Sequence, residues 1–140
     1  MNRLRYAIGI AAVLSSMIYT TTYPLISKAQ EECLSVYIHS PMTIEPEILN
    51  IAKGDCVVWI NRAAGDNVRV IFSEGTKCAG MTESPFRFRM DTNGCYSTDY
   101  LGFGVTSSLV FPKMGKFNYA VEFSRASGGF YRATGSVIVK

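Results

Sequence analysis

From Leu34 onward, apolar and polar residues alternate along the chain in short runs. In "LSVYIHS" the residues Leu34, Val36 and Ile38 form one set and Ser35, Tyr37 and His39 the other. Alternation with period two, rich in β-branched and aromatic residues, is typical of half-buried strands. The later runs are EILNIAKG (47–54), CVVWIN (56–61), VRVIF (68–72), SSLVF (107–111), KFNYAVEF (116–123) and GSVIVK (135–140). Seven short strands without a convincing helix predict an all-β sandwich or barrel, rich in antiparallel pairs.

The alternation also predicts which side chains face the interior. This set is Leu49, Ile51, Val57, Trp59, Val68, Val70, Phe72, Leu109, Phe111, Phe117, Tyr119, Val121, Val137 and Val139. The chain of 140 residues shows no internal repeat and no low-complexity tract. Its length suits one domain with a modest core.

The segment from Ser73 to Val105 departs from this pattern. It is long, rich in glycine and carries Cys78 and Cys95. A connection of this length in a compact domain is usually functional or closed by a crosslink. We therefore expect one long loop, with "SPFRFRM" (84–90) as a candidate strand within it.

The first residues have the form of an export signal. Arg3 and Arg5 precede an apolar stretch (6–19), and Ser27 to Ala29 place small residues at the positions that a signal peptidase reads. The prediction is a signal peptide over residues 1–29 and a mature domain over 30–140, exported to the periplasm or the extracellular space. The alternative is an uncleaved anchor helix, which would then be the chain's contact with a membrane.

Charge excludes one class of partner. The whole chain has 14 basic and 11 acidic residues, and the signal contains three of the basic ones, Arg3, Arg5 and Lys28. The mature net charge is therefore about zero, since 14 − 3 = 11 basic residues face 11 acidic ones. No basic patch remains to indicate nucleic acid.

Four cysteines fall in the exported part: Cys33, Cys56, Cys78 and Cys95. An even count in an oxidising compartment predicts two disulfides, for which three connectivities are possible. The spacing fits no zinc module.

Two stretches resemble the cupredoxins, the family of plastocyanin and azurin. "IEPEILNIAKGDCVVWIN" (44–61) resembles the family's proline, short strand, Gly-Asp turn and V-x-W/F-x-N strand. "FPKMGKFNYAVEF" (111–123) resembles its F-x-x-x-G-x-Y/F-x-Y-x-C run, and "GSVIV" (135–139) its closing strand. The resemblance covers Leu34 to Lys140 and implies a Greek-key β-sandwich. It also implies that the first strand runs parallel to the V-x-W strand. Cys33 and Cys56 would then lie at the same end, giving the pairs Cys33–Cys56 and Cys78–Cys95; the rival pairing ties Cys33 to the long loop.

The resemblance further implies a copper site of two His, one Cys and one Met at one end of the sandwich. The matching positions hold other residues: Asp66, Asn67 and Val68 around the first His, Val121 for the Cys, Ser124 for the second His and Ala133 for the Met. The chain contains one histidine, His39, and no cysteine after Cys95. We therefore expect no type 1 copper and no cofactor.

Other chemistry is weakly indicated. His39 falls on the polar side of its strand and is expected to face solvent. Met42, Met81, Met90 and Met114 could form a soft copper site with His39, but they are far apart in the sequence, and methionine commonly fills gaps in cores and loops. No nucleophile with a partner base and no phosphate-binding glycine loop is present, so no enzyme is predicted.

The long loop carries Tyr96, Tyr100 and Phe103 among glycines. These aromatic side chains could form a recognition surface for a protein partner or could cover the open end of the sandwich. The sequence thus predicts a binding or structural module of the cell envelope. The alternative is a copper-binding or electron-transfer protein with a non-standard site.

Overall fold

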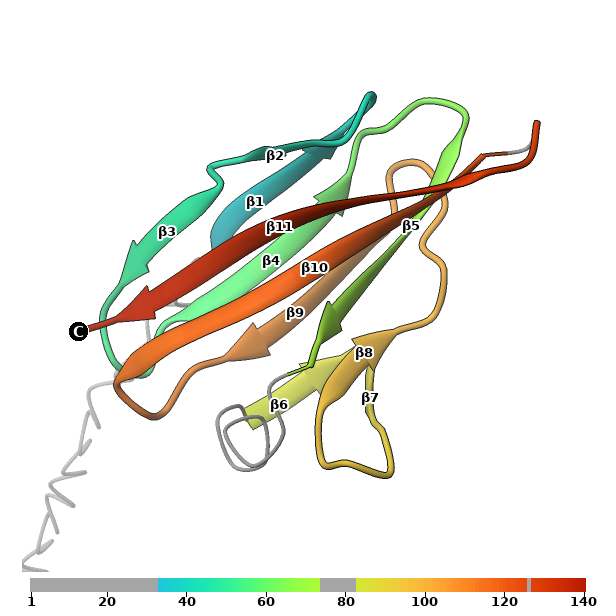
Figure 1. The fold of residues 1–140 in the computed structure, drawn as a ribbon. Coiled ribbons are helices and arrows are strands. Elements are labelled where there is room, and N and C mark those ends of the chain that lie inside the picture. The colour runs from blue at the N-terminus through green and yellow to red at the C-terminus, as the bar shows by residue number, and fades with distance from the viewer. Residues whose placement is uncertain (1–32, 74–82, 126) are drawn as a thin grey trace, which may run out of the picture.

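The computed structural model describes residues 33–73, 83–125 and 127–140, which form two β-sheets packed face to face (Figure 1). The predicted signal peptide over residues 1–29 lies outside the described residues and stays a prediction. Within the described ranges there is no helix that could cross a membrane.

Both sheets mix parallel and antiparallel pairs. The five-stranded sheet has the order β2 (Thr43–Glu45), β1 (Leu34–His39), β4 (Cys56–Asn61), β9 (Thr106–Val110), β6 (Glu83–Phe86). The six-stranded sheet has the order β3 (Ile48–Ile51), β11 (Phe130–Val139), β10 (Gly115–Arg125), β5 (Asp66–Phe72), β8 (Tyr96–Thr98), β7 (Phe88–Met90). In Figure 1 the long hairpin of β10 and β11 crosses the front of the molecule and extends past its neighbours.

The all-β sandwich is confirmed, but the number of about seven strands was too low. The described residues form eleven strands, and β6, β7 and β8 lie inside the segment expected to be one long loop. The candidate strand 84–90 is split at Arg87, whose φ of 58° interrupts the extended backbone. The additional strands have three or four residues, too few for alternation to be recognised.

The predicted core is confirmed residue by residue. Every one of the expected inward side chains, from Leu49 to Val139, is buried. Trp59 lies at the centre, with its ring centroid 5.4 to 6.4 Å from those of Phe72, Phe88, Phe111 and Tyr119. Side chains alternate between the two faces of a strand, which is why this set could be identified from the sequence.

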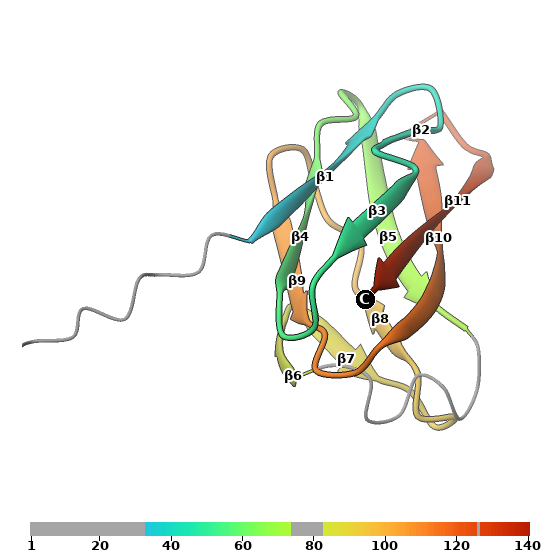
Figure 2. The ribbon, with the colours of Figure 1, turned by 90° about the vertical axis from the view of Figure 1, so that its left-hand side faces the viewer.

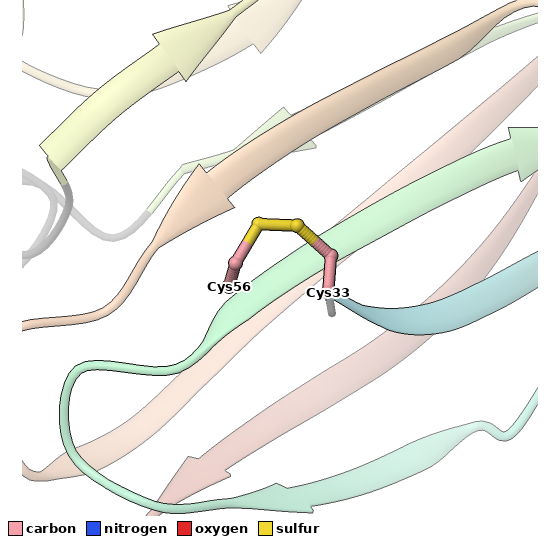
Figure 3. The surroundings of a disulfide bond; sticks show 2 residues. All are labelled: Cys33 and Cys56. Carbon is pink, nitrogen blue, oxygen red and sulfur yellow. A yellow bond between two sulfur atoms is a disulfide. The ribbon is translucent and has the colours of Figure 1, made fainter. Parts of the chain in front are cut away.

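The disulfide implied by the resemblance is present. β1 runs parallel to β4, with Leu34 opposite Val57, and Cys33 is bonded to Cys56 at the start of these strands (Figure 3). Cys95 is buried, and no free cysteine occurs among the described residues. Cys78 lies outside them, so the pair Cys78–Cys95 stays a prediction.

The buried hydroxyl of Tyr119 links the stability of the fold to pH in the alkaline range. Burial raises its pKa from 10.0 to about 12; the Trp59 side chain acts in the opposite direction, and the negative charge of Glu47 adds to the rise. The hydroxyl has no hydrogen-bond partner of good geometry among the described residues. The folded protein therefore keeps a proton that the unfolded chain releases near pH 10.

We expect the stability linked to Tyr119 to be complete below pH 10 and to fall as the pH rises from 10 towards 12. Between these values the unfolded state binds fewer protons, so the free energy of unfolding falls by about 1.4 kcal/mol per pH unit from this group. Urea unfolding over this pH range measures the slope, and Tyr119→Phe removes this contribution. Equal slopes in the two proteins would contradict the prediction.

Candidate functional site

At the end of the sandwich where β4 terminates, the buried side chain of Asn61 connects the turn between β4 and β5 with the loop that contains Leu101. Its Nδ2 donates hydrogen bonds to the carbonyl of Asp66 at 3.1 Å and to that of Leu101 at 2.9 Å. Its Oδ1 accepts from the N–H of Ala63 at 2.8 Å. One fully buried amide thereby satisfies three backbone groups from segments up to 40 residues apart in the sequence.

Asp66 connects two further turns to the same end, the one after β1 and the one between β10 and β11. Its carboxylate accepts a hydrogen bond from the Ser40 hydroxyl at 3.0 Å and lies 3.4 Å from Nε of Arg125. The Asp66 side chain is 5% exposed, so its charge needs these partners. The Arg125 guanidinium also lies 4.7 Å from the centre of the Tyr131 ring. In the sequence, Asp66 matches an empty copper position, and no signal there indicates Ser40, Asn61 or Arg125 as its surroundings.

The loop from Asp99 to Val105 is held at both ends by backbone hydrogen bonds. Leu101 and Val68 exchange two of them, at 2.7 and 3.0 Å. Gly104 donates to the carbonyl of Asn61 at 2.7 Å, and Asn61 donates to that of Val105 at 3.1 Å. The backbone on both sides of Phe103 is therefore held in place by these hydrogen bonds.

The structure separates the three aromatic residues that the sequence grouped. Tyr96 is buried in β8, so its assignment to a partner surface was wrong, because pairing of β8 with β5 and β7 turns this side chain inward. Tyr100 and Phe103 are 44% and 66% exposed. The candidate contact surface is thus Tyr100 and Phe103, which we call the aromatic loop surface.

A small pocket of about 240 Å³ adjoins the aromatic loop surface. It is lined by Arg87, Arg89, Asp99, Tyr100, Leu101, Gly102 and Val105. Arg89 pairs with Asp99 at 3.1 Å, and both side chains are largely exposed, so this is a solvated ion pair of the kind that adds little stability. The pocket brings a cationic wall next to an exposed aromatic ring.

The positions equivalent to the family's copper ligands do not converge. Asp66, Val68 and Val121 lie on inward positions of their strands, and all three are buried. Asn67 and Ser124 are opposite each other on the outer face of the six-stranded sheet. Val121 is paired with Ala133 inside the continuous β10–β11 hairpin, which runs from Gly115 opposite Val139 to Ser124 opposite Phe130.

These residues do not fit a copper ion. Valine and alanine side chains have no donor atom, and the Asp66 carboxylate is already engaged by Ser40 and Arg125. In the part of the chain that the structure describes, no group of three or more His, Cys, Asp or Glu could hold a metal.

The alternative soft site is not assembled by the described residues either. His39 is partly exposed and lies 3.8 Å from Glu45. Met42 follows β1, at the end where Asn61 lies, whereas Met114 lies in the turn before β10, at the opposite end of the sandwich. Met81 is outside the described residues.

No protein-family model and no curated protein matches this chain. Solved structures of amicyanin are similar to it: a reduced Cu(I) form of one mutant has a TM-score of 0.49 and 24% identity, covering 81% of this chain and 87% of that chain. A second amicyanin mutant, with Cu(I), has a TM-score of 0.49 and 25% identity, covering 77% of this chain and 82% of that chain. An oxidized amicyanin mutant has a TM-score of 0.48 and 25% identity, with the same coverage of the two chains. With two packed sheets, β1 parallel to β4 and a closing strand β11 beside β3, the described residues have the β-sandwich arrangement that the resemblance to the cupredoxins implies.

Proposed function

We propose that this protein is an exported binding module of the cell envelope, which contacts a partner protein through the aromatic loop surface. The form of the N-terminal sequence and the Cys33–Cys56 disulfide support export, because disulfides persist in oxidising compartments. The observation that carries the proposal is the exposure of Phe103 on a loop whose two ends are anchored to β4 and β5.

An anchored aromatic side chain is well suited to recognition. A single exposed aromatic residue is ordinary on a protein surface. Here, however, the backbone around Phe103 is fixed by hydrogen bonds to Val68 and Asn61, so binding orders little additional chain. The partner that suits this surface has an apolar patch for Phe103 and Tyr100 and an acidic group for the arginine-lined pocket beside them.

Photo-crosslinking in the cells that produce the protein tests this proposal. We expect a photoreactive phenylalanine analogue at position 103 to give one dominant adduct with another envelope protein, identified by mass spectrometry. Met114 is the matched control position, since it is 69% exposed at the opposite end of the sandwich. Absence of an adduct at position 103, or the same adduct from both positions, would contradict the proposal.

A further inference from the structure

One edge of β11 has no neighbouring strand over half its length. On one side β11 is paired with β10 from Phe130 to Val139. On the other side β3 pairs only with Ser136 to Val139. Figure 2 looks onto this edge, where β2, β3 and β11 meet. Residues 130–135 therefore have no strand partner on this side among the described residues.

The backbone groups that face this open edge can be identified from the hydrogen bonds of β3. Ser136 donates its N–H to the carbonyl of Glu47 at 2.9 Å, so even-numbered residues of β11 point towards the β3 side. Successive residues of a strand direct their N–H and C=O to opposite sides. The pairing with β10 continues without a register shift, which places the N–H and C=O of Arg132 and Thr134 on the open edge. Such unpaired groups are a template for another strand.

A groove lies directly against these groups, with β2 on its other side. This groove of about 250 Å³ separates Ala133 and Thr134 from Met42, Thr43 and Ile44, with Glu47 at one end. A larger hollow of about 470 Å³ continues from Glu47 and Thr134 over the outer face, past Arg132. The groove offers Met42, Ile44 and Ala133 as apolar contacts, next to the polar side chains of Thr43, Thr134 and Glu47. The hollow carries Arg132, which forms no ion pair with any described residue.

From this geometry we propose that the open edge of β11 binds an extended segment of another protein, which adds a strand in line with β3. Its alternate apolar side chains pack on Ile44 and Ala133, and its acidic side chains face Arg132. Main-chain hydrogen bonds to Arg132 and Thr134 supply the affinity, as in other cases of strand addition. This surface is distinct from the aromatic loop surface, so either proposal can fail alone.

A second copy of the chain suits the edge less well. The free backbone groups lie in the groove between β2 and β11, which a single strand can enter and the equally recessed edge of another copy cannot. Symmetric pairing about Arg132 would also oppose two arginines, and like charges directly opposite one another destabilise a strand pair.

Amide hydrogen exchange and peptide titration of the purified protein test the proposal. In the free protein the amides of Arg132 and Thr134 should exchange faster than those of Ala133 and Gly135, which face β10. The probe is the peptide acetyl-Thr-Val-Glu-Val-Thr-Val-Glu-amide. We expect saturable binding and slowing of exchange at Arg132 and Thr134 by about tenfold or more. A version of the probe with N-methyl groups on alternate residues cannot donate these hydrogen bonds and should not bind.

Two variants at one position separate the backbone from the side chain. Thr134→Pro removes an N–H that points away from β10 and is expected to weaken binding by about tenfold or more. Thr134→Val keeps the N–H and should bind like the unaltered protein. Equal binding by the two variants, equal binding of the N-methylated probe, or no saturable binding would each overturn the proposal. Protection of these amides that grows with protein concentration, without peptide, would assign the edge to a second copy and overturn it too. If Thr134→Pro does not fold, the N-methylated probe decides.

Discussion

Replacing Asn61 with alanine is expected to lower the free energy of unfolding by about 3 kcal/mol, because it removes three buried hydrogen bonds to backbone groups. Those groups are the carbonyls of Asp66 and Leu101 and the N–H of Ala63. The Leu101 carbonyl keeps its second hydrogen bond, from the N–H of Val68. The side chain itself is fully buried, so water cannot replace the amide without opening this end of the sandwich. Chemical unfolding monitored by the fluorescence of Trp59 measures the loss.

The same change should release the loop that carries Phe103. Leu101 is bonded to Val68 through its backbone and to Asn61 through its carbonyl, so its amide should exchange faster in Asn61→Ala. Asn67→Ala is the matched control, since Asn67 is an exposed asparagine on the neighbouring strand and is expected to change stability by less than about 0.5 kcal/mol. Comparable losses in the two variants would refute the special role of Asn61.

Replacing Gly135 with alanine is expected to destabilise the protein by about 3 kcal/mol, through overpacking in the β10–β11 hairpin. Gly135 is paired with Tyr119, and the Tyr119 ring lies over it so closely that an added Cβ would collide with the ring and its hydroxyl. The ring cannot move aside easily, because it packs against Trp59 and Phe72 at centroid distances of 5.5 and 5.6 Å. Thermal unfolding measures the effect.

Gly102→Ala is the control for this substitution. At Gly102 an added Cβ would meet only Oδ1 of Asn67, at 3.8 Å, so the change should be nearly neutral. The double variant Gly135→Ala/Tyr119→Leu should lose less stability than the two single changes together, because the collision is absent once the ring is removed. Strict additivity would show that the ring is not the cause.

The strands and the core were predictable because their signal is local. Trp59, Val70 and Val121 were assigned to the interior from alternation alone, and all three are fully buried. β2 and β8 were missed because strands this short have no period to read. The stretch 84–90 was suggested as one strand, and a positive φ at Arg87 divides it into β6 and β7.

The candidate site was predictable only in part. Phe103 and Tyr100 were chosen as exposed aromatics of a long segment, and they are exposed. Tyr96 was chosen for the same reason and is buried, because the pairing of the short strand β8 with β7 directs the Tyr96 side chain inward. The free edge of β11 had no signal in the sequence, because it depends on where β3 ends relative to β11.

The sequence by itself determined the class of fold, the interior residues and the absence of the copper-ligand residue types at Val121, Ser124 and Ala133. These follow from residue type and period-two spacing, which are properties of neighbouring residues. Only the tertiary structure decided that Asp66 lies between Ser40 and Arg125, and that Asn61 reaches Leu101 across 40 residues. Such contacts are set by how strands from distant parts of the chain pair, and the alternation within each strand does not specify its partner.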